Sequence, residues 1–322
     1  MRAIQIVKTG GPEVLELVEL PQPALKSGEV LVKIAAAGVN FIDTYLREGR
    51  YPAPLPFVPG QEAAGTVVAL GDGVSGFAAG DRVAWANVRG AYAEFAAVPA
   101  ADLLKVPDGL SLEDAAAVLL QGMTAHYLAV DTYAIRRGDT VLVHAGAGGV
   151  GLLLTQMAKM RGATVLTTVS TEAKAELSRA AGADHVILYM QENFADAVKK
   201  MTGGSGLPVV YDSVGKTTFE DSLKCLRPRG LMALFGGSSG AVPPFDLIRL
   251  SSMGSLYITR PSLKDYTLTR VELEQRAAEV FGWVASGALK VRIGHRYKLE
   301  DAVQGHRDLE GRQTTGKVLF VP

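Results

Sequence analysis

The pattern of hydrophobic and polar positions differs between the two halves of the chain. Over the first 120 or so residues, short apolar runs such as 30–34, 66–70 and 82–85 alternate with Gly, Pro and Asp turns. This pattern predicts mostly β-strand. Residues 51–60 contain four prolines. We predict an extended loop there, because proline cannot donate to a sheet ladder.

From residue 111 the pattern changes. Ser111, followed by Leu-Glu-Asp, indicates a helix N-terminus with a capping serine. Beyond residue 139 strands and helices alternate at regular spacing, and the strands are apolar throughout, as expected when helices cover both faces. The alternation predicts a parallel, doubly wound sheet. The predicted strands are 140–144, 164–169, 185–188, 208–211, 231–235 and 255–259, and the predicted helices are 149–160, 172–181, 192–201 and 216–226.

The last 60 or so residues contain one amphipathic helix, 269–286, and a terminal strand, 316–320. They are too few for a domain of their own, so we expect them to rejoin the N-terminal part. A chain of 322 residues is itself long enough for two domains.

Charge and cysteine content narrow the function classes. Lys plus Arg and Asp plus Glu both number 33, so no net field attracts nucleic acid or an anionic membrane. No uncharged apolar run reaches the roughly 18 residues of a membrane span, and we expect a cytoplasmic protein without membrane partners.

Cys225 is the one cysteine, which excludes an internal disulfide and a zinc site of several thiolates. Its apolar helical surroundings predict a buried structural thiol.

Two copies of the pattern G-x-G-x-x-G occur among the 36 glycines, so the bare pattern is a weak signal. The copy at 71–76 leads into another turn, which predicts a surface loop. The copy at 146–151 follows a buried strand and opens a helix, as in dinucleotide-binding folds. Gly146 would allow the tight turn, Gly148 would let backbone approach a pyrophosphate, and Gly151 would let the helix pack on the sheet. Free N–H groups at the helix start would bind the phosphates.

The end of the second strand distinguishes the two nicotinamide cofactors. NAD sites carry Asp or Glu there to hold the ribose 2′-hydroxyl, whereas this strand ends in Thr-Val-Ser170. Glu172 is a competing candidate, but a carboxylate in a first helical turn is already stabilised by the helix dipole. Lys174 in the same turn is unfavourable unless an anion faces it, and a 2′-phosphate would be such an anion. We therefore predict NADPH rather than NADH.

Several strings carry a family resemblance that runs from end to end: 10–15, 37–45, 62–65, 145–151, 210–215, 254–261 and 315–318. The chain resembles the medium-chain dehydrogenase/reductase superfamily, and within it the NADPH:quinone oxidoreductases related to zeta-crystallin. Asn-Phe-Ile-Asp-Thr-Tyr at 40–45 and Tyr-Asp-Ser-Val-Gly at 211–215 are the strings typical of that narrower group. The match is weakest at Ser170, where relatives are expected to carry glycine.

The resemblance implies an α/β fold: a GroES-like, β-rich catalytic domain, 1–123 plus 262–322, and a central Rossmann NADPH-binding domain, 124–261. It also implies a homodimer joined near 255–259. The nicotinamide half would lie in the interdomain cleft. The implied cofactor contacts are Phe41, Asp43 and Tyr45 at the nicotinamide, Gly149 and Val150 at the phosphates, Ser170, Lys174 and Tyr189 at the 2′-phosphate, and Tyr127, Ser213, Gly236, Ser238 and Arg312 elsewhere.

The sequence departs from the zinc-dependent alcohol dehydrogenases of the superfamily, which offer Cys and Gly-His-Glu as ligands. The corresponding stretches read Gly-Val-Asn at 38–40 and Gly-Gln-Glu at 60–62. Thiolate and imidazole, which zinc prefers, are both lost. The four-cysteine structural lobe of those enzymes is also missing. We therefore expect no metal.

Without a Lewis acid, an alcohol is not readily polarised for oxidation, but hydride can reach an electron-poor acceptor such as a quinone. Asn40, Tyr45, Tyr51 and Gln61 are the polar candidates for the acceptor pocket. Asn40 could instead shape a turn, Tyr51 anchor the proline loop and Gln61 support Glu62.

Two other functions remain open at this point: NADPH-dependent reduction of enones or enals, and a structural or RNA-binding role like that of crystallin relatives. The absence of a basic stripe counts against RNA. The histidines at 126, 144, 185, 295 and 306 have no ligand-like spacing, and we interpret them as structural or surface residues.

Overall fold

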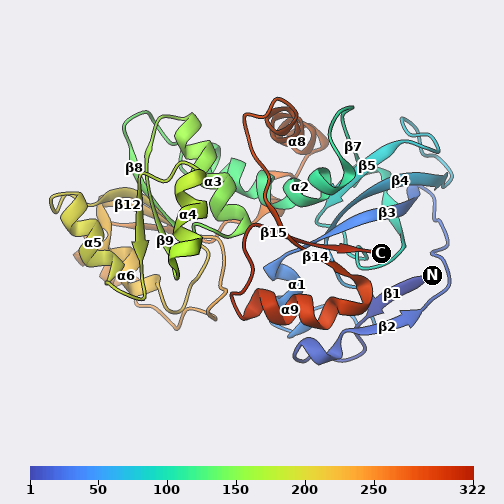
Figure 1. Cartoon of the computed structure of the whole chain (residues 1–322), viewed down its shortest axis with the longest axis horizontal. Coiled ribbons are helices and arrows are strands. Elements are labelled where there is room, and N and C mark those ends of the chain that lie inside the picture. The colour runs from blue at the N-terminus through green and yellow to red at the C-terminus, as the bar shows by residue number, and fades with distance from the viewer. The chain divides into compact units, whose positions relative to one another are not determined.

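A computed structural model describes residues 1–322 and divides them into two compact units (Figure 1). The first, which we call the β-rich unit, comprises Met1–Met123 and Thr267–Pro322. The second, the Rossmann unit, comprises Thr124–Tyr266. Together they form the mixed α/β fold, with a Rossmann sheet and a GroES-like domain, that the sequence predicts.

The Rossmann unit contains one sheet of six strands in the order β10-β9-β8-β11-β12-β13, all parallel. The predicted doubly wound sheet is therefore confirmed. The strand order reverses between β8 and β11, and in such sheets ligands bind outside the carboxyl ends of the strands at this point. The strands are β8 (Thr140–His144), β9 (Thr164–Val169), β10 (His185–Leu188), β11 (Leu207–Asp212), β12 (Leu226–Leu234) and β13 (Tyr257–Thr259).

Helices cover both faces of this sheet, with α3 and α4 on one face and α5 and α6 on the other (Figure 1). The structure shortens the predicted helix 216–226, because left-handed Gly215 (φ 87°) continues the turn and α6 begins only after Thr218. Strand β12 correspondingly begins five residues earlier than predicted, at Leu226 rather than 231. The helices are α3 (Gly149–Met160), α4 (Glu172–Ala180), α5 (Phe194–Met201), α6 (Phe219–Lys224) and α7 (Ile248–Ser252).

Cys225 closes α6 and is buried, as predicted for a structural thiol. Burial raises the pKa of the thiol to about 12. The thiolate, which is the nucleophilic form, is therefore disfavoured at neutral pH.

The β-rich unit contains a mixed sheet in the order β14-β15-β3-β4-β5-β7, with β6 pairing β3, and a separate β1-β2 pair. The C-terminal strand β15 pairs antiparallel with β3. The C-terminal residues from Thr267 onward therefore lie in the same compact unit as residues Met1–Met123. The strands are β1 (Arg2–Gln5), β2 (Glu16–Glu19), β3 (Glu29–Val39), β4 (Glu62–Leu70), β5 (Arg82–Ala86), β6 (Phe95–Pro99), β7 (Leu104–Lys105), β14 (Ile293–Lys298) and β15 (Lys317–Val321).

Local capping explains where the helices of this unit begin. The hydroxyl of Ser111 accepts the Asp114 N–H at 2.9 Å before α2, and Thr269 forms a capping box with Glu272 before α8. Both predicted helix starts are confirmed. Helices α1 and α9 and strand β14 were not predicted, because each is short and its pattern is interrupted by aromatic or charged residues. The helices are α1 (Phe41–Arg47), α2 (Leu112–Tyr127), α8 (Arg270–Ala285) and α9 (Ala302–Glu310).

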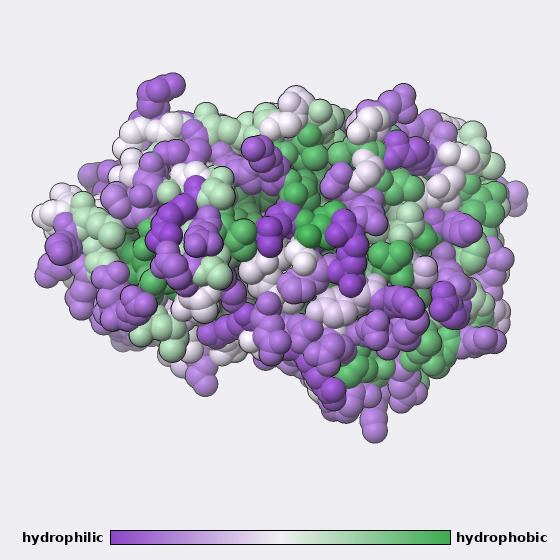
Figure 2. All heavy atoms as spheres, viewed as in Figure 1, coloured by the Kyte–Doolittle hydropathy of each residue, from purple (hydrophilic) through white to green (hydrophobic).

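Two predicted loops are also confirmed. Residues 51–60 contain no helix or regular strand, and residues 71–76, the first glycine pattern, form turns between β4 and β5. On the face drawn in Figure 2, hydrophobic and hydrophilic residues are interspersed. None of the helices is both long and apolar enough to cross a membrane.

Candidate cofactor-binding and active site

The second glycine pattern forms the connection from β8 to α3. Ala145 adopts a left-handed conformation (φ 53°), and Gly148 is the N-cap of α3. The N–H of Leu152 bonds to the Gly148 carbonyl at 2.9 Å, so the preceding N–H groups at 149–151 have no partner within the helix. These groups and the positive end of the helix dipole make an anion site.

The three glycines of the G-x-G-x-x-G pattern, Gly146, Gly148 and Gly151, differ in the space around them. A Cβ added at Gly146 would lie 2.6 Å from the Thr167 Cβ, and one at Gly151 would lie 2.2 Å from the Ala145 oxygen. Packing therefore requires both glycines. The left-handed residue of the turn is Ala145, so Gly146 is needed for contact with β9 rather than for the turn itself, which corrects the prediction. A Cβ at Gly148 would approach nothing closer than 3.2 Å.

Ser170, Lys174 and Tyr189 gather at the carboxyl end of β9. Ser170 directly follows the strand, and the Tyr189 N–H donates to the Val169 carbonyl at 3.2 Å. The hydroxyl of Thr171 caps α4 by accepting the Lys174 N–H at 3.4 Å. The competing acid has a partner in its own helix, because Glu172 forms an exposed ion pair with Arg179 at 2.5 Å.

The other predicted cofactor residues of the Rossmann unit follow β11 and β12. A Cβ at Gly236 would lie 2.3 Å from the Ser213 oxygen, and the Ser238 N–H donates to the same carbonyl at 3.2 Å. These three residues therefore form one compact group. Tyr127 is buried and stacks on Tyr266, with ring centroids 4.2 Å apart.

In the β-rich unit, the two stretches that replace zinc ligands meet in a buried polar cluster. Lys317 of β15 forms an ion pair with Glu62 and donates to the Asn40 Oδ1 at 2.9 Å. The Asn40 Nδ2 donates to Glu62 at 2.9 Å, and the Leu120 N–H donates to the other carboxylate oxygen at 2.6 Å. Gln121 also donates to the Asn40 Oδ1, at 3.1 Å. The carboxylate and the amide are thus satisfied by protein groups.

Tyr45 and Tyr51, two further candidates for the acceptor pocket, form an aromatic group with Phe41. The ring centroid of Tyr45 lies 6.3 Å from that of Phe41 and 5.9 Å from that of Tyr51. The Arg50 guanidinium lies 5.3 Å from the Tyr45 centroid. Tyr51 is 42% exposed and Gln61 is half-buried, and neither side chain has a polar partner within the chain. Gln61 therefore does not bond to Glu62.

Asp43, a predicted cofactor contact, is fully buried. Its Oδ2 accepts the Asn40 N–H and the Tyr92 hydroxyl, both at 2.9 Å, whereas its Oδ1 has no partner. Burial raises the pKa of this carboxyl to about 7. The first of these bonds completes a capping box at α1. The pattern Asn-x-x-Asp is the sequence signal that could have revealed this helix.

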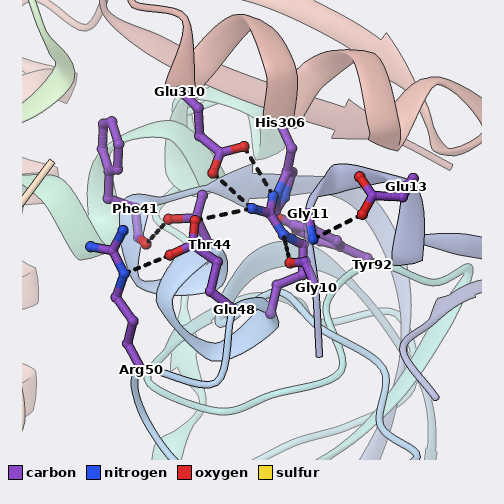
Figure 3. Close-up of polar contacts among 11 residues, drawn as sticks. Gly10, Gly11, Glu13, Phe41, Thr44, Glu48, Arg50, Tyr92, His306 and Glu310 are labelled. Carbon is purple, nitrogen blue, oxygen red and sulfur yellow. Dashed lines mark hydrogen bonds and ion pairs between the residues drawn. The ribbon is translucent and has the colours of Figure 1, made fainter. Parts of the chain in front are cut away.

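The hydrogen bonds continue from Tyr92 to α9 (Figure 3). Arg47 lies 2.9 Å from the His306 Nδ1, and the Tyr92 hydroxyl lies 3.3 Å from the Nε2. Because a guanidinium only donates, Nδ1 accepts and the ring proton lies on Nε2, facing Tyr92. Burial lowers the pKa of His306 to about 3. Sequence reasoning did not single out Arg47 or Tyr92 and interpreted His306 as a structural or surface residue. The three residues approach one another only through the fold.

Arg47 joins separate segments of the β-rich unit. Its guanidinium, 1% exposed, pairs with Glu310 of α9 at 2.7 Å and donates to the Gly10 carbonyl at 3.1 Å. A buried charge persists only with such compensation. Arg312, a predicted cofactor contact, follows α9 in an exposed turn and is left-handed (φ 57°).

A groove of about 740 Å³ in the β-rich unit contains none of the predicted site residues. Its walls are the loop 73–77, residues 104–107 and one side of α8. No group of three or more His, Cys, Asp or Glu side chains is arranged to hold a metal ion.

Two protein-family models match this chain: an alcohol dehydrogenase GroES-like domain at residues 26–108 and a zinc-binding dehydrogenase at 149–282. Fold and matches together define a medium-chain dehydrogenase/reductase. The chain is 46% identical to quinone oxidoreductase 1 of Escherichia coli, over 99% of each chain. It belongs to the quinone oxidoreductase family.

Solved structures agree with this assignment. An Escherichia coli quinone oxidoreductase complexed with NADPH has a TM-score of 0.98 at 46% identity, covering 100% of both chains. A mycobacterial protein complexed with NADPH has a TM-score of 0.97 at 53% identity, also over 100% of both chains. A 2-haloacrylate reductase of Burkholderia is 43% identical over 99% of this chain and 98% of its own.

Proposed function

We propose that this enzyme reduces quinones with NADPH. The observation that carries the proposal is the open glycine turn at the start of α3, with Lys174 at the carboxyl end of the adjacent strand. This arrangement fits a phosphorylated dinucleotide. The relatives that match the whole chain and are named quinone oxidoreductases support the same reaction.

The chain's own groups would hold the cofactor at the carboxyl edge of the Rossmann sheet. The N–H groups of Gly149 and Val150 bind the pyrophosphate, and Lys174 with Ser170 and Tyr189 binds the 2′-phosphate. Ser213, Gly236 and Ser238 contact the cofactor elsewhere. Bound NADPH supplies the hydride, and the protein's part is to position donor and acceptor. Contacts from Phe41, Asp43, Tyr45, Tyr127 and Arg312 stay predictions.

The acceptor side belongs to the β-rich unit. Tyr51 and Gln61 have polar atoms that are not used by the protein, so they can bind the quinone oxygens. Asn40 acts differently from what its place in the family motif suggests, because both ends of its amide already bond to Glu62, Lys317 and Gln121. Its part is to hold the start of α1 against β4.

The reaction proceeds without zinc. Zinc prefers thiolate and imidazole ligands, and here the corresponding positions are the amides of Asn40 and Gln61, with only the carboxylate of Glu62 retained. The carboxylate is already paired with Lys317. Reduction of an electron-poor quinone requires no Lewis acid. The enzyme acts in a reducing compartment, the cytoplasm, which its lone buried thiol supports.

A second candidate function is reduction of an activated C=C bond. The 43% identity to a 2-haloacrylate reductase favours it, and both reactions need the same hydride geometry. The test is a steady-state screen of NADPH oxidation with 1,4-benzoquinone, 2-alkenals and 2-haloacrylate. Quinone reduction should have the highest kcat/KM. A higher value for either C=C substrate would instead identify the enzyme as a reductase of activated C=C bonds.

The enzyme is a homodimer in which β13 of two copies pair. Strand β13 is the edge of its sheet, and an edge strand has free backbone groups. Tyr257 in this strand is 61% exposed, and nearby Leu247 and Ile248 are 71% and 73% exposed. Sedimentation equilibrium should give twice the mass of one chain. A mass equal to that of one chain would refute the proposed dimer.

A further inference from the structure

A chain of buried hydrogen bonds joins the carboxyl ends of β9, β8 and β11. The His144 Nδ1 lies 2.8 Å from the Thr168 hydroxyl, and its Nε2 lies 2.9 Å from the Ser222 hydroxyl. Ser222 in turn bonds to the Asp212 Oδ2 at 2.9 Å. Each of the four side chains is at most 2% exposed.

Asp212 sets the direction of this chain. Its Oδ1 accepts the N–H groups of Val214 at 2.8 Å and Gly215 at 2.9 Å, and its Oδ2 accepts two hydroxyls. With four donors directed at it, the carboxylate is an acceptor only. Ser222 therefore donates its hydrogen to Asp212 and accepts one from the His144 Nε2. The Nδ1 must then accept from Thr168.

The histidine stays neutral in this environment. Burial lowers the pKa of His144, and the ring of Phe194 packs edge-on against it at 4.7 Å between centroids. A neutral ring has one donor and one acceptor, and both are used. The hydrogen bonds that link the four side chains thus all point the same way, from Thr168 on β9 to Asp212 at the end of β11.

The two ends of this series of hydrogen bonds hold two loops at the carboxyl end of the Rossmann sheet. At one end, the Thr168 carbonyl accepts the Gly146 N–H at 3.0 Å, and His144 directly precedes the glycine turn. At the other end, Asp212 holds the backbone of 214–215. Strands β8 and β11 are adjacent at the reversal of the strand order, where doubly wound sheets bind ligands.

The residue types resemble a hydrolytic Ser-His-Asp triad, but the order excludes that chemistry. In a triad the histidine lies between serine and aspartate and accepts the serine proton. Here Ser222 lies in the middle and donates to the carboxylate, and no member is accessible to a substrate.

We propose that Thr168, His144, Ser222 and Asp212 form a positioning network that holds the glycine turn and the loop 213–215 at one spacing, and so sets the affinity for the dinucleotide. The inference rests on the proposed function in NADPH binding. None of the four side chains contacts the cofactor. The network acts through the backbone of the two loops.

The decisive variant is Thr168→Val, which keeps the side-chain shape and the carbonyl bond to Gly146 but removes the donor to His144. We expect its Kd for NADPH to rise about five- to tenfold, the effect of one buried hydrogen bond, and kcat at saturating NADPH to stay within about twofold. Thr168→Ser restores the hydroxyl and should restore the affinity.

Thr155→Val is the matched control. The Thr155 hydroxyl of α3 is equally buried in the same unit but has no hydrogen-bond partner. This variant should bind NADPH like the wild type. An unchanged Kd in Thr168→Val, or an equal loss in Thr155→Val, would overturn the network.

A double variant separates positioning from general loosening of the fold. Ser222→Ala breaks the same chain at another link, so Thr168→Val with Ser222→Ala should bind NADPH no worse than the weaker single variant. Fully additive losses would contradict one connected network.

The tautomer can be read without the cofactor. ¹⁵N NMR of the cofactor-free enzyme should show His144 protonated at Nε2 only, and protonation at Nδ1 would refute the chain of donors. A wild type that bound no NADPH would instead overturn the proposed function, and the NMR result would still decide whether the directed chain exists.

Discussion

The ammonium group of Lys317 and the carboxylate of Glu62 form an ion pair that is almost completely excluded from solvent, with the side chains 1% and 0% exposed. The pair joins β15, at the end of the chain, to β4. Because Lys317 also donates to Asn40, the pair contacts both stretches in which zinc-dependent members of the superfamily carry metal ligands. A buried ion pair adds little net stability, but removal of one partner leaves an uncompensated charge.

Lys317→Met should therefore lower the free energy of unfolding of the β-rich unit by about 3–5 kcal/mol. Both tryptophans, Trp85 and Trp283, lie in this unit, so their fluorescence during urea unfolding reports on it alone. Lys317→Met combined with Glu62→Gln removes both charges and should recover most of the loss. A double variant as unstable as the single one would contradict this account.

The proposed zinc-free reaction predicts that exhaustive chelation leaves quinone reduction unchanged. The carboxylate and amide at the former ligand positions are bonded to protein groups and hold no metal in the proposed reaction. The measurement is the initial rate before and after dialysis against a strong chelator. Inactivation that zinc reverses would show that the enzyme needs the metal.

The geometry of the glycine turn predicts that one glycine variant loses NADPH binding and another loses stability. Gly148→Ala meets no atom closer than 3.2 Å, so the protein should fold normally but bind NADPH at least about tenfold more weakly, because the methyl group lies where backbone approaches the phosphates. Gly151→Ala meets backbone at 2.2 Å and should be destabilised itself. Thermal unfolding without cofactor and NADPH titration distinguish the two. Normal binding by Gly148→Ala would remove this turn from the cofactor site.

Lys174→Ala tests the selectivity for a phosphorylated cofactor. A hydrogen bond to a charged group contributes about 1.5–3 kcal/mol, so the Kd for NADPH should rise roughly 10- to 100-fold while that for NADH changes little. Lys200→Ala, which removes a cation from the last turn of α5 in the same unit, is the control and should affect neither cofactor. Equal losses for NADPH and NADH would refute a 2′-phosphate contact.

The pH dependence of stability should reveal Asp43 and His306 acting in opposite directions. The pKa of Asp43 is raised from 3.8 to about 7, so the folded state binds the extra proton and stability falls as pH rises through this window. The pKa of His306 is lowered from 6.5 to about 3, so the unfolded state binds the extra proton and stability rises over nearly the same window. In the wild type the two slopes largely cancel.

Variants should uncover each slope between about pH 4 and 6. Asp43→Asn should make the free energy of unfolding rise about 1.4 kcal/mol per pH unit more steeply than in the wild type, and His306→Gln should change the slope by a similar amount in the opposite sense. Asparagine fits here because Oδ1 of Asp43 has no partner and Oδ2 is the acceptor. Urea unfolding followed by tryptophan fluorescence at several pH values gives the slopes. Slope changes of the same sign would show that these two groups do not titrate as described.

The sequence by itself determined the parallel sheet of the Rossmann unit, because that information is local. Apolar strands, the glycines at 146–151 and the capping residues each act within a few neighbours, and strands β8, β9 and β10 begin and end at the predicted residues. Helix α1 was not predicted because its seven residues give too short a pattern, although its capping box was present in the sequence.

Only the tertiary structure decided which polar residues are free to act and which hold the fold together. Asn40 and Asp43 stand in the family motif, yet the fold surrounds them with Lys317, Glu62 and Tyr92, from segments far away in the sequence. His144 and His306 had no ligand-like spacing, and their hydrogen-bond partners lie 24 to 259 residues away. Such contacts depend on strand order and burial, which side-chain patterns along the chain do not encode.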